Sequence, residues 1–195
     1  MQTQQKPPST EQIRDFVIAG HGNLDRVKQM LAENPQLLNV SYQWNDNDRE
    51  TAIQAAAQVG NTQVARYLLD NGAPLEICTA AMLGRRDAVE HLLKGDPLSA
   101  SATGAHGIPL LPHAVWSGDL ELVQLVYQYG AKSGSTLALH NAVAKGNYEI
   151  ARWLLENAKP DIGSKNFQGK TPLMAADDRK DEKMAQLLRG YGAED

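Results

Sequence analysis

"AAAQVGNTQVARYLL" (residues 55–69) contains the pattern that decides the fold of this chain. Three alanines come first, and alanine both favours helix and lets a neighbouring backbone approach closely. Gly60 follows, at a point where a helix can end in the left-handed conformation that a Cβ disfavours. Beyond it, Val64, Ala65, Leu68 and Leu69 share the spacing of one helix face. The stretch therefore predicts a short helix, a tight turn and a second helix with a single apolar stripe.

The same pattern occurs six times along the chain. The other clear copies are "TAAMLGRRDAVEHLL" (79–93), "HAVWSGDLELVQLV" (113–126) and "NAVAKGNYEIARWLL" (141–155), and the weaker ones are "VIAGHGNLDRVKQML" (17–31) and "AADDRKDEKMAQLL" (175–188). The central position holds Gly22, Gly60, Gly84, Gly118, Gly146 and Lys180. One such hairpin cannot bury its own apolar face, so the copies are expected to stack into a solenoid.

The repeated phrases resemble those of ankyrin-repeat proteins over nearly the whole chain. The family phrase T-P-L-H-x-A-A-x-x-G is matched by "TPLMAADDRK" (171–180), "TAIQAAAQVG" (51–60) and "LALHNAVAKG" (137–146), and "FQGKTPL" (167–173) matches the turn that leads into a repeat. The resemblance implies an all-α ankyrin-repeat solenoid of stacked helix–turn–helix pairs with β-hairpin fingers. Lys180 in place of glycine and Pro112 in place of the usual histidine depart from the pattern, and the first repeat lacks T-P-L-H.

The repeats predict the organisation of the chain. Residues 1–9 are expected to be a flexible tail and residues 10–195 an ankyrin-repeat domain. The six repeats are expected at about 10–40, 51–74, 75–98, 109–132, 137–160 and 171–195.

The spacing of the central positions is uneven. Residues 22, 60, 84, 118, 146 and 180 are separated by 38, 24, 34, 28 and 34 residues, against a family repeat of about 33. A short interval has no room for both helices and a finger. Fingers are therefore expected only at about 39–50, 99–108 and 161–170, whereas "GAPLEICT" (72–79) and "GAKSGSTLAL" (130–139) predict tight connections. The alternation indicates a two-repeat unit used three times.

Composition and charge limit the class of partner. The 195-residue chain is 42% apolar and carries a net charge of −4, so it has no broad basic field for nucleic acid. Cys78 is the only cysteine, which excludes an internal disulfide. The N-terminal segment lacks the layout of a signal peptide and no apolar run is long enough to span a membrane. We expect a cytoplasmic protein with a protein partner, and neither nucleic acid nor membrane binding.

No catalytic site, cofactor site or metal site is expected. The five histidines form no H-x-x-x-H or H-E-x-x-H pair, and "NDNDRE" (45–50) lacks the glycine and glutamate of a calcium loop. The resemblance implies that His140 is structural and bonds a neighbouring loop. Cys78, at the same family position one repeat pair earlier, is expected to be a buried thiol.

The three tryptophans have different expected roles. Trp153 lies in the apolar stripe of a second helix and is expected in the core. Trp116 precedes Gly118, at the end of a first helix that in the family faces the concave groove. Trp44, in the long first finger, either contacts a partner or folds back onto its own finger, and the sequence leaves both open.

The resemblance implies a binding surface made of the residues before each central position and of the finger tips. These are Gln58, Val59, Met82, Leu83, Trp116, Ser117, Ala144, Lys145, Asp178 and Arg179, together with Trp44, Asp46, Asp48, Arg49, His106, Lys165, Asn166 and Phe167.

The sequence therefore predicts a non-catalytic scaffold that binds a protein partner through its concave face and finger tips. One alternative is a regulatory or inhibitory subunit of a specific enzyme. A second is a ligand-binding or hydrolytic protein with a site between repeats, for which a deep pocket around His106, His113, Asp119 and Glu121 would be the evidence.

Overall fold

The computed structural model describes residues 7–194 of the chain. The elements are α1 Thr10–Gly20, α2 Leu24–Glu33, η1 Pro35–Leu37, β1 Ser41–Asn45, β2 Asp48–Thr51, α3 Ala52–Gln58, α4 Thr62–Asp70, α5 Ile77–Met82, α6 Arg86–Gly95, η2 Pro97–Ser101, η3 Ala105–Gly107, α7 Leu110–Ser117, α8 Leu120–Gln128, α9 Ser135–Lys145, α10 Tyr148–Asn157, α11 Pro172–Asp178 and α12 Glu182–Gly190.

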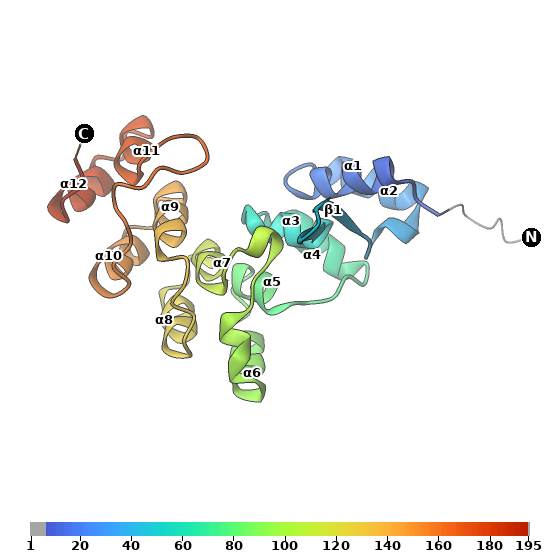
Figure 1. Ribbon diagram of the computed structural model, residues 1–195, viewed down its shortest axis with the longest axis horizontal. Coiled ribbons are helices and arrows are strands. Elements are labelled where there is room, and N and C mark those ends of the chain that lie inside the picture. The colour runs from blue at the N-terminus through green and yellow to red at the C-terminus, as the bar shows by residue number, and fades with distance from the viewer. Residues whose placement is uncertain (1–6, 195) are drawn as a thin grey trace, which may run out of the picture.

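Within residues 7–194 the helices form six consecutive pairs that stack into an elongated solenoid, with α1 and α12 at opposite ends of the stack (Figure 1). The first helix of a pair packs on the first helix of the next, as α5 does on α7 and α7 on α9. This architecture confirms the all-α ankyrin-repeat solenoid expected from the repeated phrases.

Local sequence signals set the ends of the first helices. The Thr51 hydroxyl accepts a hydrogen bond from the Gln54 backbone N–H, and the Gln54 side-chain oxygen accepts one from the Thr51 backbone N–H, which completes a capping box. Gly60 takes the left-handed conformation expected of it, with φ of +73°. Lys180 adopts the same conformation with φ of +56°, so the sixth turn forms without glycine.

The three expected fingers differ in structure. In the first, β1 and β2 pair antiparallel, with a register irregularity between Gln43 and Asn45. The second holds two 3-10 turns and a single bridge between Thr103 and Pro109, where glycines and proline interrupt any ladder. The third is closed by turn hydrogen bonds around Asn166 instead of by strands. Among the described residues, a two-stranded sheet therefore forms only in the first finger.

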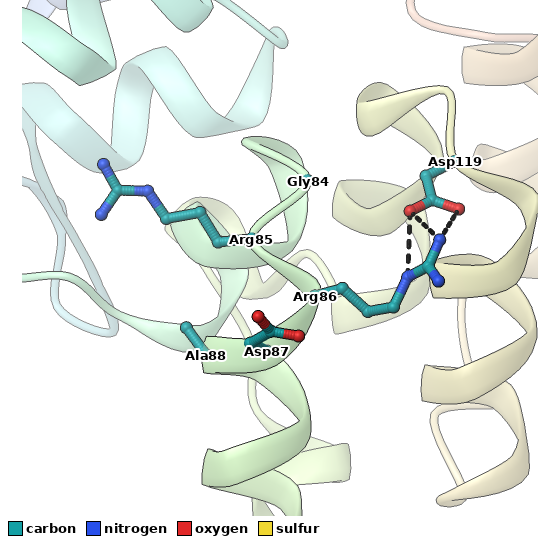
Figure 2. A pocket seen from close by; sticks show the side chains of 6 residues that line it. All are labelled: Gly84, Arg85, Arg86, Asp87, Ala88 and Asp119. Atoms are coloured by element: carbon teal, nitrogen blue, oxygen red, sulfur yellow. Dashed lines mark hydrogen bonds and ion pairs between the residues drawn. The ribbon is translucent and has the colours of Figure 1, made fainter.

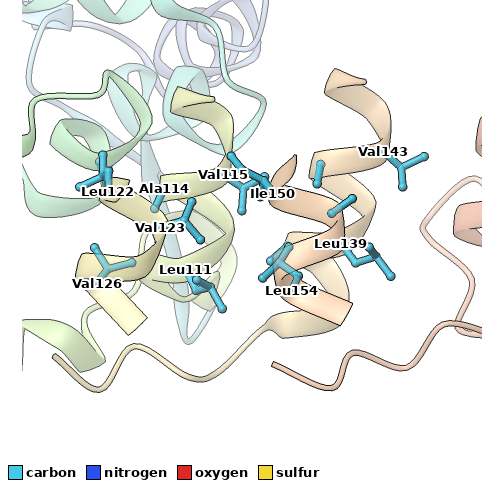
Figure 3. Close-up of a cluster of buried hydrophobic side chains, with 14 of the residues drawn as sticks. Leu111, Ala114, Val115, Leu122, Val123, Val126, Leu139, Val143, Ile150 and Leu154 are labelled. Atoms are coloured by element: carbon cyan, nitrogen blue, oxygen red, sulfur yellow. The ribbon is translucent and has the colours of Figure 1, made fainter. Parts of the chain in front are cut away.

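Buried apolar side chains within residues 7–194 fall into two clusters. The larger one runs through α5–α12, and Figure 3 shows part of it, with Leu111 and Val115 of α7 near Leu122 and Val123 of α8. The smaller one lies within α1–α4 and includes Met82 from the end of α5. The boundary between the two clusters lies at the join of the second and third helix pairs, which residues 71–76 connect without a finger.

The division into a tail at 1–9 and a repeat domain at 10–195 stays a prediction. Residues 1–6 of that tail, and residue 195, lie outside the described residues. Across the described part, no helix has the length and apolar character needed to cross a membrane.

Candidate protein-interaction surface

Trp116 joins the second and fourth helix pairs. Its indole Nε1 donates a hydrogen bond to the Gln58 backbone carbonyl at 3.0 Å, and the half-buried ring packs against the smaller core cluster. A Cβ placed on Gly60 would lie 2.7 Å from the ring, so the indole occupies space that only glycine leaves free. The expectation that Trp116 contacts a partner stays a prediction, although its polar edge and one ring face are used within the molecule.

Other residues before the central positions also link successive repeats. The Arg179 guanidinium donates to the Ala144 carbonyl at 2.6 Å, and the Lys145 side chain lies over Gly118. Asp178 forms an ion pair with Lys170 at 2.6 Å. Ala144, Lys145, Asp178 and Arg179 are all exposed, so they remain candidates for partner contact while also connecting the stack.

Four other expected surface residues are tied into the fold to different degrees. Met82 is fully buried, with an exposed fraction of 0%, and Leu83 packs against the same smaller cluster. Ser117 donates its hydroxyl to the Ala114 carbonyl and accepts from the Asp119 backbone. The prediction that Met82 belongs to the binding surface was wrong, because the end of α5 is buried in the smaller cluster. Val59, by contrast, is exposed.

Trp153 was expected in the core and is only half-buried. It lies against the larger cluster and meets the Tyr127 ring edge-on, with centroids 5.2 Å apart. A tryptophan on a second helix is too large for the narrow space between neighbouring second helices, so its ring reaches the outer edge of the stack.

In the first finger, Trp44 folds back onto its own hairpin. Its Nε1 donates to Glu50 Oε2 at 2.8 Å, and its ring meets Tyr42 edge-on and lies 6.3 Å from the His106 ring. Of the two roles that the sequence left open, the structure places the ring in the internal one. Asp46, at the tip of the same finger, is exposed.

Several further residues of the first finger and its surroundings have internal partners. Asp48 Oδ2 lies 2.6 Å from His106 Nδ1. Arg49 is exposed and bonds Gln43 across the hairpin, and the Gln58 side chain lies 3.1 Å from His21 Nε2. His106 thus connects the second finger to the first.

Glu50 is a buried carboxylate that the sequence did not single out. Its exposed fraction is 0%, and burial raises its pKa above the ordinary value, against the opposing effects of the Trp44 hydrogen bond and of the His21 and His106 imidazoles. Each histidine directly precedes a glycine, at a turn, but no local spacing pairs residues 21, 50 and 106. Only the stacking of the repeats brings them together.

The third finger presents the most exposed aromatic side chain. Phe167 is 94% exposed at the finger tip, beside exposed Lys165. The half-buried Asn166 shapes the turn, because its side-chain oxygen accepts from the backbone N–H groups of Gln168 and Lys170. The tip is therefore held in one conformation while the phenyl ring is left uncovered.

The hollow beside Asp119 does not form the deep pocket that a hydrolytic site requires. It measures about 550 Å³, is open to solvent, and is lined by residues 84–88 and Asp119. Figure 2 shows Arg86 reaching Asp119, with Nη2 and Oδ2 2.7 Å apart, while Arg85 extends away. Asp119 is the only one of the four residues named for a cryptic site that lines this hollow, so the hollow gives that alternative no support.

The buried histidines and the cysteine have structural surroundings. His140 Nε2 donates to the Ser164 carbonyl at 3.0 Å, which is the loop contact expected for it, and His113 Nδ1 donates to the Ala57 carbonyl at 3.1 Å. Cys78 is buried as expected, and desolvation raises its pKa to about 12. A thiol with such a pKa is not a nucleophile near neutral pH.

Comparison with known proteins agrees with this architecture. The family model described as ankyrin repeats (3 copies) matches residues 16–102 and again residues 111–195. The chain belongs to the ankyrin-repeat family, and ankyrin repeats are protein-interaction modules.

Several relatives share parts of the chain. A putative ankyrin repeat protein FPV014 of Fowlpox virus is 32% identical over 126 residues, which cover 62% of this chain and 29% of the relative. The I-Kappa-B like protein C2 of Microplitis demolitor bracovirus is 37% identical over 92 residues, covering 42% and 50%. The B-cell lymphoma 3 protein homolog of Mus musculus is 32% identical over 165 residues, covering 74% and 36%. The chain thus spans half or less of the length of these three relatives.

Proposed function

We propose that this chain is a non-catalytic protein-binding module whose contact surface is centred on the third finger. The observation that carries the proposal is Phe167, an aromatic side chain left 94% exposed on a turn that is itself fixed by hydrogen bonds. Large aromatic residues contribute much of the binding energy at protein interfaces. A preformed turn lowers the ordering cost of association.

The neighbouring α11 extends this surface. Met174, on the helix that follows the finger, is 45% exposed and adds a flexible apolar side chain. Exposed Lys165 in the finger and the ion pair of Lys170 with Asp178 add charges of both signs. We therefore expect a partner that offers an apolar pocket for the phenyl ring, bordered by polar groups.

The family and the charge support the remaining parts of the proposal. Ankyrin repeats serve as interaction modules, and the relatives carry no enzyme designation in the names given above. The net charge of −4 favours a protein partner over nucleic acid. The cytoplasm is the proposed location, in keeping with a single buried thiol.

A regulatory role is the second candidate. The similarity to proteins named I-Kappa-B like and to the B-cell lymphoma 3 protein homolog favours a module that controls its partner over one that only tethers it. Addition of the purified chain to the isolated partner distinguishes the regulatory role from simple tethering. A regulator changes the activity of its partner on binding, whereas a tether leaves it unchanged.

The test compares two exposed apolar residues on different segments. The wild-type chain, Phe167→Ala and Leu98→Ala are used as baits in the native cell, and captured proteins are quantified by mass spectrometry. Leu98 is 79% exposed but lies in η2, so it is a matched control. We expect Phe167→Ala to lose the specific partner and Leu98→Ala to retain it. Capture at the wild-type level by Phe167→Ala would refute this surface.

A further inference from the structure

Three side chains with metal-binding atoms meet at the base of the first finger. His21 follows α1, Glu50 lies in β2, and His106 lies in η3 of the second finger. One ligand atom from each lies within 4.8 Å of the other two. The site thus draws on the first repeat and on two fingers that are more than fifty residues apart in the chain.

Glu50 has the features of a metal ligand. Its carboxylate is fully buried, and Oε1 has no hydrogen-bond partner within residues 7–194. A buried charged oxygen without a partner is unfavourable, and buried charges are usually paired or bound to a metal. Oε2 is held in place by the Trp44 indole at 2.8 Å.

The distances between the atoms suit a small tetrahedral ion. His21 Nε2 lies 3.5 Å from Glu50 Oε1, and His106 Nε2 lies 3.4 Å from Glu50 Oε2. Two ligands at about 2.05 Å from a tetrahedral zinc ion are roughly 3.3 Å apart. Both pairs are therefore near the required separation, whereas the ligand atoms of the two imidazoles, which lie within 4.8 Å of each other, must move closer together.

The outer nitrogens of both imidazoles already have the acceptors that metal-bound histidines require. His106 Nδ1 lies 2.6 Å from Asp48 Oδ2, and His21 Nδ1 lies 3.3 Å from the Ile18 carbonyl. A metal-binding histidine almost always donates its other ring N–H to a carboxylate or carbonyl. With a proton on Nδ1 alone, both Nε2 lone pairs can bind an ion beside Glu50, and His21 Nε2 then no longer donates to Gln58 Oε1.

We propose that His21, Glu50 and His106 bind one zinc ion through the two Nε2 atoms and the Glu50 carboxylate. Gln58 Oε1, 3.1 Å from His21 Nε2, supplies an oxygen at the fourth position. Two imidazoles and a carboxylate suit Zn²⁺ better than Mg²⁺ or Ca²⁺, which prefer oxygen ligands. The ion would connect the first repeat to both fingers, close to the boundary between the two core clusters.

Binding is measured on the full chain without a histidine tag. The protein is stripped with a chelator, dialysed, and titrated with ZnCl₂ by calorimetry in a buffer that does not bind zinc. We expect one equivalent to bind and the melting temperature to rise, because the ion binds the folded state. Tryptophan fluorescence should change on binding, and Trp44→Phe should remove most of that change because Trp44 contacts Glu50.

Substitutions locate the ion. Loss of a residue that only hydrogen-bonds a metal ligand weakens metal binding by about 10- to 100-fold. His106→Ala and Glu50→Gln remove ligands themselves and should weaken zinc binding at least as much. Asp48→Asn should weaken it within that range and leave the helical circular dichroism spectrum unchanged. His91→Ala is the matched control, because His91 is exposed and is not part of this group. It should bind zinc as the wild type does.

Cobalt provides an independent readout of geometry. Co²⁺ in place of zinc should give the intense visible absorption of a four-coordinate ion, without a thiolate band. The absence of one-equivalent binding, equal affinity in the wild type and His106→Ala, or a thiolate band from Cys78 would each overturn the proposal. If zinc does not bind at one equivalent, His21, Glu50 and His106 form an ion-pair cluster only.

Discussion

The indole of Trp116 donates a hydrogen bond to the backbone carbonyl of Gln58, 58 residues earlier in the chain. The contact passes beside the short α5 and connects the second and fourth helix pairs directly. It lies at the boundary between the two core clusters, where the apolar contact between neighbouring repeats is reduced. Trp116 is therefore part of what orients the first two repeats relative to the other four.

Substitution of Gly60 tests this packing. Gly60→Ala places a methyl group 2.7 Å from the Trp116 ring and forces a left-handed conformation on alanine. We expect a loss of roughly 2–5 kcal/mol in the free energy of unfolding, because overpacking costs about 1–3 and the backbone strain about 1–2 kcal/mol. Urea unfolding measures the loss.

A double-mutant cycle separates the two causes. In a Trp116→Ala background the clash disappears and only the backbone strain remains, so Gly60→Ala should cost about 1–2 kcal/mol there. An equal cost of Gly60→Ala in both backgrounds would show that the indole does not occupy this space.

Trp153→Ala is expected to be milder than removal of a core tryptophan. The ring is half-buried and loses its edge-on contact with Tyr127. The expected loss is about 1–3 kcal/mol, below the 3–5 kcal/mol typical of a buried tryptophan. A loss above that range in urea unfolding would mean that Trp153 belongs to the core.

Stability should fall on acidification through the buried histidines. Burial lowers the pKa of His113 and of His140 below the ordinary value. Below about pH 6.5 the unfolded chain therefore binds more protons than the folded chain. The stability that the two neutral histidines contribute is present above that pH and is lost as the pH falls towards their folded-state pKa values. Urea unfolding at about pH 7.5 and about pH 5.5 measures it.

The exposed His91 again supplies the control for this pH effect. His140→Asn should reduce the difference in unfolding free energy between the two pH values, whereas His91→Ala should leave it unchanged. The same difference in His140→Asn and the wild type would show that other groups cause the acid sensitivity.

Asp119 has two structural roles at the start of α8. It accepts hydrogen bonds from the backbone N–H groups of Glu121 and Leu122, and it pairs with Arg86. Asp119→Ala should cost about 1–2 kcal/mol, mostly through loss of the helix cap. Arg86→Ala should cost less, because that guanidinium is largely solvated. A larger loss for Arg86→Ala in thermal unfolding would reverse this assignment.

The stacked helix pairs could be predicted because their signals are local. The alanines before Gly60, the apolar stripe after it and the cap at Thr51 lie within twenty residues, and each acts on its own hairpin. The loop contact of His140 followed from the family phrase. The absence of fingers at 71–76 and 129–134 followed from length alone, because two helices leave no room for them.

The surface was harder to predict because it depends on the angle between repeats. A residue before a central position faces the groove only if the next repeat stacks regularly. At the boundary of the two clusters it does not, so Met82 is buried and Trp116 packs on Gly60. The group around Glu50 was missed for the same reason, since its members come from three separate segments.

The two apolar clusters also determine how cooperatively the molecule unfolds. In a linear stack each repeat is stabilised by its neighbours, and unfolding is all-or-none only while every interface is strong. At the join of the second and third helix pairs, two polar contacts from α7 to α3, Trp116 with Gln58 and His113 with Ala57, supplement a reduced apolar contact. We therefore expect the first two repeats to open while the other four stay folded, so that the chain unfolds as two cooperative units instead of one.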